Sequence, residues 1–150
     1  MMNKNEQLAH KYFTDGYNCA QSVFAAFHEE MGMDEKTALK ISSAFGGGLG
    51  RLREVCGAVS GMFMVLSCLY GYDDPNAGAE KKQLYARVQE LAGKFRDING
   101  SIICRELLDN PPSDPNPSPR TAQYYAQRPC VRMVMTAADL LDEFIENNPI

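Results

Sequence analysis

The sequence predicts an all-α protein: a compact, irregular helical bundle around a central buried helix that starts near Cys56. Three observations support this fold class. Apolar residues recur at helical spacing in several separate segments. Residues 55–72 form an almost wholly apolar run. No stretch alternates between apolar and polar residues for long enough to indicate a strand.

The prediction of the central helix rests on residues 45–71, FGGGLGRLREVCGAVSGMFMVLSCLYG, in which a glycine-rich segment comes first and the helix starts near Cys56. A helix that is apolar on every side is typical of a buried position. Gly57 and Gly61 are four residues apart and share one face, where another helix can approach closely. A membrane span is the competing interpretation, but residues 55–72 are only just long enough, since a span needs about 20 apolar residues. The sequence therefore favours a core helix in a protein that is not itself transmembrane.

The N-terminal part is predicted to contain three helices. Residues 5–13 form the first, and Asn18 with Gln21 is a capping pair for the second. Gly32 ends the second helix, and Asp34 caps a third that runs to about residue 45. The inward faces of the second and third helices carry Val23, Phe24, Phe27, Met31, Ala38, Ile41, Ser42 and Phe45.

The C-terminal half is predicted to alternate helices with breaks. Its helices cover residues 77–98, residues 101–108 with Ser101 as the cap, residues 121–126, and a last helix with Pro129 in its first turn. The buried sides of the two long helices carry Leu84, Val88, Leu91, Phe95, Ile98, Val131, Val134, Ala138, Leu141 and Ile145. Residues 109–119 hold five of the eight prolines and are predicted to form an extended surface loop.

The length and charge of the chain limit its class. With 150 residues it is expected to form one domain, residues 1–150. A net charge of −4 argues against nucleic acid as a partner, which would call for a basic patch. Residues 1–7 are polar and carry no signal segment, so a cytoplasmic location is expected. The five cysteines are then expected to be thiols rather than structural disulfides, and the apolar content permits a homodimer.

Four of the five cysteines fall near predicted helix starts. Unpaired N–H groups and the positive end of the helix dipole favour a thiolate there, which lowers the cysteine pKa. Arg105 and Arg128 adjoin two of these thiols and add positive charge. A thiolate is both a nucleophile and a metal ligand. The sequence therefore predicts a functional set of four thiols: Cys19, Cys56, Cys104 and Cys130.

The remaining cysteine and the glycine-rich segment are interpreted as structural. Cys68 lies about 18 Å from Cys56 along one straight helix, so it is predicted to be a core residue. Residues 46–50 are predicted to be a flexible joint that places Cys56. A phosphate loop is not indicated, because no strand precedes the glycines and no Gly-Lys-Ser/Thr follows them. The chain also lacks a C-x-x-C pair.

Five segments occur in a fixed order along the chain. They are residues 16–21 (GYNCAQ), residues 45–48 (FGGG), residues 56–61 (CGAVSG), the Gly100-Ser101 approach to Cys104, and Cys130. In this order they resemble the C_GCAxxG_C_C family of redox-active proteins, and the resemblance covers nearly the whole chain. It implies a redox role for the four shared cysteines and leaves Cys68 outside the pattern. Members often lie near transporter genes, which implies a redox partner associated with membrane transport.

Three functions remain open from the sequence. In the first, the four thiols converge and two or more cycle between dithiol and disulfide, with Cys56 as the expected attacking thiol because the glycine joint can expose it. In the second, Cys19, Cys56, Cys104 and Cys130 hold zinc or an iron–sulfur cluster, both of which accept four cysteines. Electron transfer through such a cluster would combine these two interpretations. In the third, the protein is a non-catalytic helical module whose thiols only pack, as free cysteines often do.

Overall fold

The computed structural model describes residues 3–150; Met1 and Met2, which open the polar N-terminal segment, lie outside the described residues. The chain is all-α, as predicted. Its helices are α1 (Lys4–Thr14), α2 (Cys19–Ala26), α3 (Glu35–Ile41), η1 (a 3₁₀ helix, Ser43–Phe45), α4 (Gly46–Leu49), α5 (Gly57–Tyr70), α6 (Gly78–Asn99), α7 (Cys104–Leu108), α8 (Ala122–Gln127) and α9 (Cys130–Asn147).

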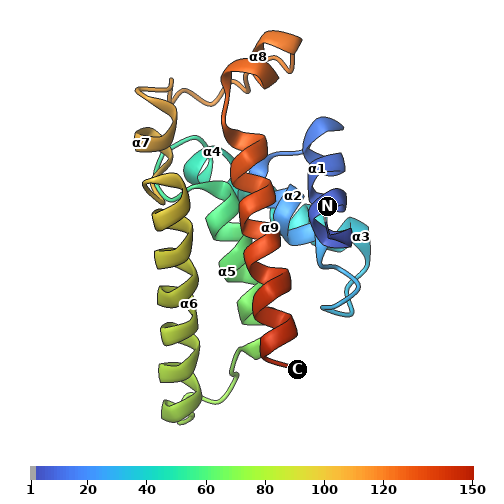
Figure 1. Cartoon of the computed structure of the whole chain (residues 1–150), viewed down its shortest axis with the longest axis vertical. Helices are drawn as coiled ribbons and strands as arrows, with labels where there is room; N and C mark the ends of the chain where they lie inside the picture. The colour runs from blue at the N-terminus through green and yellow to red at the C-terminus, as the bar shows by residue number, and fades with distance from the viewer. Residues whose placement is uncertain (1–2) are drawn as a thin grey trace.

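The three long helices α5, α6 and α9 run side by side and form the body of the bundle (Figure 1). The shorter helices α1, α2 and α3 lie on the opposite side of α9 from α6 (Figure 1). Helix α2 packs against α5, and α1 packs against α9. Helices α4, α7 and α8 lie toward the end of the bundle where α9 begins (Figure 1). This end carries the candidate site.

Helices α2 and α5 approach each other closely, as the spacing of two glycines predicts. A Cβ atom added to Gly61 would lie 2.9 Å from the backbone oxygen of Ala20, and one added to Gly57 would lie 3.2 Å from the Ala20 nitrogen. Real Cβ atoms rarely come this close to backbone, so an added methyl group would require the neighbouring chain to shift. The two glycines therefore set the distance between the helices.

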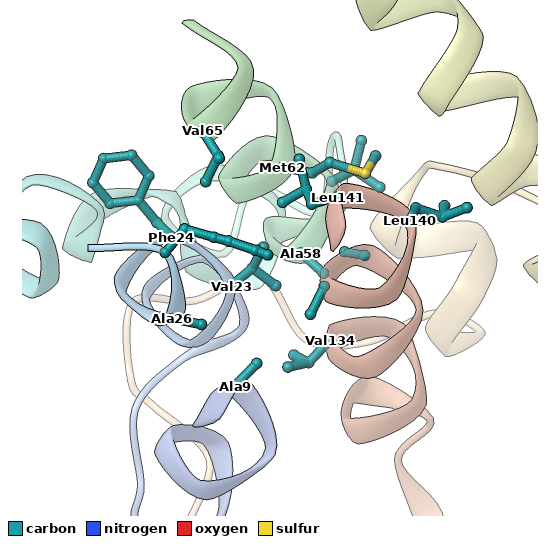
Figure 2. Packing of buried hydrophobic residues seen from close by; sticks show 14 of the residues in the cluster. Ala9, Val23, Phe24, Ala26, Ala58, Met62, Val65, Val134, Leu140 and Leu141 are labelled. Atoms are coloured by element: carbon teal, nitrogen blue, oxygen red, sulfur yellow. The ribbon is translucent and has the colours of Figure 1, made fainter. Parts of the chain in front are cut away.

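The hydrophobic core fills the space between α1, α2, α5, α6 and α9. Figure 2 shows Val23 and Phe24 of α2 beside α5, with Val134 of α9 and Ala9 of α1 on the other side of the cluster. The largest fully buried side chains are Phe13, Phe24, Phe27, Phe95, Met62, Leu66, Leu91, Leu141, Val23, Val59, Val65 and Val134. Burying one such side chain stabilises a fold by about 1.5–3 kcal/mol, so this cluster is the main source of stability.

Two helix starts follow the predicted capping chemistry. The backbone N–H of Gln21 donates to Asn18 Oδ1 at 2.9 Å, and the backbone N–H of Asn18 donates to Gln21 Oε1 at 3.1 Å. This reciprocal pair fixes the first turn of α2, which begins at Cys19. At α3 the side chain of Asp34 accepts from the Thr37 N–H at 3.2 Å.

Several predicted boundaries are wrong by a few residues. The cap of α7 is Ile103, and Ser101 instead accepts a hydrogen bond from the Ile103 N–H at 3.0 Å. Pro129 precedes α9 rather than lying in its first turn. The predicted third helix divides into α3 and the 3₁₀ helix η1. Ile41 and Ile98, predicted to face inward, are exposed because they lie at the ends of α3 and α6.

The second half of α5 is not buried all round, which corrects the prediction for one cysteine. Val65 and Leu66 are fully buried, but Ser67 and Cys68 are exposed. Neighbouring helices cover only part of this turn, so Cys68 is a surface residue and not a core residue. No helix within residues 3–150 combines the length and the apolar character needed to cross a membrane.

Replacing the exposed thiol tests this placement. Cys68→Ser is expected to change the free energy of unfolding by no more than about 0.5 kcal/mol, because surface substitutions away from special contacts have small effects. Urea unfolding followed by circular dichroism measures the change. A loss of more than about 1.5 kcal/mol would instead show that the thiol packs in the core.

Candidate functional site

The four predicted thiols come together at one end of the bundle. Cys19, Cys104 and Cys130 line a cavity of about 310 Å³, called the cysteine cavity below. Cys56 does not line it, but its neighbour Gly57 does, and its thiol lies close enough to Cys104 and Cys130 to interact electrostatically. Cys68 has no part in this cluster. The four thiols therefore lie in one cluster, as expected from the sequence, but Cys56 lies behind the wall of the cysteine cavity and not on it.

Backbone pairing brings two of the thiols together although they are distant in sequence. Val55 and Ile103 form an isolated antiparallel β-bridge. On either side of it, the Cys56 N–H donates to Ile102 O at 2.8 Å and the Cys104 N–H donates to Glu54 O at 2.6 Å. These bonds place Cys104 beside the start of α5.

The glycine-rich segment is a closely packed wall of the cysteine cavity. Gly48 has φ +72°, and a Cβ there would lie 2.6 Å from the Cβ of Cys104 and 2.7 Å from the Cα of Arg53. The Glu54 N–H also donates to Gly48 O at 2.9 Å, which ties the segment down. Cys56 behind this wall is only 6% exposed. The expectation that a glycine joint exposes Cys56 is therefore wrong.

Four arginines also line the cysteine cavity: Arg51, Arg53, Arg120 and Arg128. Sequence reasoning identified Arg128 but missed the other three, and it selected Arg105, which lies elsewhere. Arg105 is about half exposed and pairs with Glu54 at 2.6 Å. No Asp, Glu or Lys is among the lining residues that the structure describes.

Arg53 is the most deeply buried of these arginines, with 4% of its surface exposed. Its Nε donates to Pro112 O at 2.9 Å, and its Nη1 donates to Cys104 Sγ at 3.6 Å. Its Nη2 is buried and has no hydrogen-bond partner in the described part of the chain. Arg51 and Arg53 both have left-handed backbone, with φ +67° and +62°. Arg53 thus links a thiol to the proline-rich loop and keeps one donor unused.

The proline-rich loop, residues 109–119, forms the outer wall of the cysteine cavity. It contains no helix or strand, as predicted, and Pro115 and Pro117 line the cavity. Arg51 holds the loop through a bond from its Nε to Asp114 O at 2.7 Å and a longer bond from Nη1 to Ser118 Oγ at 3.3 Å. The loop is therefore tied to the glycine-rich segment through arginine side chains.

Arg120 connects this outer wall to the first helix. It donates to Phe13 O at 3.0 Å and to Tyr17 O at 2.9 Å. Its guanidinium lies 4.5 Å from the ring centroid of Phe13 and 4.9 Å from that of Tyr124. Cation–π contacts of this kind add roughly 0.5–2 kcal/mol each. They position the start of α8, and with it the chain that leads to Cys130.

Cys130 has the thiol best suited to ionise. A hydrogen bond from the Cys19 side chain lowers the pKa of Cys130 to about 7; burial opposes the shift, and the nearby charges of Arg128, Arg120 and Arg53 support it. The same hydrogen bond, together with burial, raises the pKa of Cys19 well above its usual value. Of these two thiols, Cys130 therefore ionises more readily, and Cys19 tends to stay protonated beside it.

The other two thiols are held in the protonated form. Burial raises the pKa of Cys56 to about 12 and outweighs the opposing effect of the Val59 and Ala58 backbone N–H groups. Burial also raises the pKa of Cys104, although its bond from Arg53 acts in the opposite direction. The expectation of a lowered pKa at helix starts is wrong for Cys19, Cys56 and Cys104. The pKa of Cys130 is lowered, but by Cys19 and the nearby arginines rather than by the helix start.

The arrangement does not fit the metal interpretation. Within residues 3–150, no three His, Cys, Asp or Glu side chains are placed so that they could hold a metal ion. A four-cysteine zinc site needs four thiolate sulfurs about 2.3 Å from one ion. The described residues therefore do not form a four-thiolate site for zinc or an iron–sulfur cluster.

Comparison with known proteins identifies a family for this chain. No curated protein and no solved structure is similar to this chain at a significant level. The family model described as "Putative redox-active protein (C_GCAxxG_C_C)" matches residues 17–144. This match covers most of the chain and includes all four cysteines of the cluster. The chain therefore belongs to the C_GCAxxG_C_C family of redox-active proteins.

Proposed function

We propose that this protein carries out thiol–disulfide exchange, with Cys130 as the attacking thiolate and Cys19 as the resolving thiol. The observation that carries the proposal is that both side chains line the cysteine cavity, where they lie close enough to shift each other's pKa in opposite directions. Two thiols placed together in this way need only a small movement to form a disulfide. This assignment replaces Cys56, which does not line the cavity and whose raised pKa does not suit attack.

The reaction needs a disulfide as its electron acceptor. The Cys130 thiolate attacks one sulfur of the acceptor, forms a mixed disulfide, and releases the other sulfur as a thiolate that takes up a proton. Cys19 then loses its proton and attacks the Cys130 sulfur. The Cys19–Cys130 disulfide forms and the second acceptor sulfur leaves as a thiol. The acceptor gains two electrons and two protons: both electrons and one proton, that of Cys19, come from the protein, and the second proton comes from solvent, which received it when Cys130 ionised.

Cys56 and Cys104 have a supporting role in this scheme. Both are buried and both have raised pKa values, so they remain thiols while Cys130 reacts. Cys104 also accepts the bond from Arg53, which holds this arginine near the reacting pair. A cytoplasmic location, which we also propose, would keep all four cysteines reduced between turnovers.

The test determines which thiol attacks first, in a protein that carries Cys68→Ser. Reduced protein is treated with oxidised glutathione, quenched in acid, and its disulfides are mapped by mass spectrometry. We expect a Cys19–Cys130 disulfide. Cys19→Ser should stop at a glutathione adduct on Cys130, because the resolving thiol is missing. Cys130→Ser should form at most about 1% as much glutathione adduct in the same time, because no thiol with a lowered pKa remains.

Two outcomes would contradict the proposal. A Cys56–Cys104 disulfide as the main product would assign the chemistry to the other pair. Equal adduct formation in Cys19→Ser and Cys130→Ser would mean that Cys130 is not the attacking thiol, which favours the interpretation of the thiols as packing residues.

A further inference from the structure

The walls of the cysteine cavity carry more positive charge than the chain itself balances. Four arginines line it, and no Asp or Glu among the described lining residues faces them. Asp114 is a nearby carboxylate, but its Oδ2 lies 3.9 Å from Arg51 Nη2, on the exposed side of the loop. Arginine stays protonated in proteins, so these charges are permanent.

Arg53 shows the imbalance most clearly. Its guanidinium is almost completely buried, and its two bonded nitrogens reach a carbonyl and a sulfur rather than a carboxylate. Its Nη2 is buried and has no acceptor among residues 3–150. A buried charge without a counter-charge is strongly unfavourable, and a buried donor without an acceptor adds to the cost. A group that supplies both a negative charge and an acceptor oxygen at Nη2 would remove both costs.

The thiols cannot supply the missing charge by themselves. A thiolate at Cys130 contributes one negative charge against the four guanidiniums, and sulfur is a weak acceptor. The start of α9 adds to the demand, since this 18-residue helix begins at Cys130 in the cavity wall and no side chain caps it. Free N–H groups at the start of a helix also favour an anion.

We propose that the cysteine cavity is an anion-binding site and that Arg53 Nη2 binds an oxygen of a carboxylate, phosphate or sulfonate group on the ligand. A volume of about 310 Å³ is at the lower end of small-molecule sites, so the ligand is a small solute. As an extension that rests on the proposed thiol chemistry, the disulfide that Cys130 attacks carries such an anionic group. The Arg53 guanidinium, which also contacts Cys104, would hold that group beside the thiols.

Binding is tested with inorganic sulfate as the probe. Isothermal titration calorimetry of the reduced protein, at ionic strength held constant with chloride, should give saturable binding. Arg53→Gln should weaken it at least tenfold, and Arg128→Gln provides a second variant at the cavity wall if Arg53→Gln does not fold. The matched control is Arg105→Gln, which removes an exposed arginine outside the cavity and should leave the dissociation constant unchanged. Absent binding, or equal weakening by Arg105→Gln, would overturn the inference.

The anion site and the thiol chemistry can fail independently. The double variant Cys19→Ser/Cys130→Ser removes the reacting thiols and should still bind sulfate. Sulfate binding without a Cys19–Cys130 disulfide would leave the anion site standing and remove the redox proposal. A Cys19–Cys130 disulfide without sulfate binding would support the redox proposal and remove the anion site.

Two disulfides of similar size test the substrate class. Bis(2-carboxyethyl) disulfide carries two carboxylates, and bis(2-hydroxyethyl) disulfide is neutral. For each protein, the oxidation rate with the anionic disulfide is divided by the rate with the neutral one. We expect this ratio to be at least tenfold higher in the unmodified protein than in Arg53→Gln. An equal rate ratio in both proteins would show that the cavity does not select an anionic disulfide.

Discussion

At pH 8, Cys130 is expected to react with iodoacetamide on the order of 100 times faster than Cys56. Their pKa values, about 7 and about 12, make Cys130 mostly thiolate at this pH and leave Cys56 about one part in 10,000 thiolate. A thiolate of lower pKa is intrinsically less nucleophilic, so the greater nucleophilicity of the Cys56 thiolate reduces the difference between the two rates by roughly a factor of 100. The difference in ionisation is the larger effect. Because Cys130 also lines the cavity and Cys56 does not, access acts in the same direction.

The pH dependence of this rate distinguishes the two thiols. The pKa of Cys130 is lowered, so its rate should rise about tenfold per pH unit below pH 7 and level off above it. The rate of Cys56 should still be rising at pH 10. The measurement uses the Cys68→Ser background, which removes the exposed thiol, and peptide mass spectrometry to assign each site. In denaturant the remaining thiols should react at similar rates. Faster labelling of Cys56 in the folded protein would contradict the assignment.

Gly48→Ala is expected to lower the free energy of unfolding by about 2–4 kcal/mol. The new Cβ would lie 2.6–2.8 Å from the Cys104 Cβ, the Arg53 Cα and the Glu54 nitrogen, two of which are backbone atoms that cannot rotate away. The left-handed φ of +72° adds strain for any residue with a Cβ. Because Arg53 and Cys104 must move, sulfate binding should weaken as well.

A matched control lies in the middle of α6. A Cβ added to Gly93 would meet nothing within 4 Å, and the backbone there is helical rather than left-handed. Gly93→Ala should therefore stabilise the protein by about 0.5–1 kcal/mol through helix propensity. Urea unfolding of both variants measures the two effects. Unchanged stability in Gly48→Ala would show that the glycine-rich segment yields easily and is not a packed wall.

Features that depend on nearby residues could be predicted from the sequence. The Asn18–Gln21 cap and the close approach at Gly57 and Gly61 depend on residue type and helical spacing alone, and both are present. The position of Cys68 could not be predicted in the same way. Its apolar neighbours in sequence indicate a buried helix, but exposure depends on which other helices cover that turn.

The arginines of the site were harder to find because their contacts are long-range. Arg53 reaches the cavity through the pairing around Val55 and Ile103, and Arg120 reaches back to the carbonyls of Phe13 and Tyr17. No sequence pattern encodes either contact. The thiol pKa values show the same limit, since the helix start is visible in the sequence but the burial that overrides it at Cys56 is not.

The backbone at Arg51 and Arg53 has a consequence for thermal stability. Both residues adopt the left-handed conformation that Gly47, Gly48 and Gly50 adopt nearby without strain. For a residue with a Cβ this conformation costs about 1 kcal/mol or more, so glycine would give the more stable backbone at both positions. Selection for thermal robustness alone would thus favour a run of glycines through this segment. In this chain the two arginines carry that backbone cost, and their side-chain bonds to the proline-rich loop offset it.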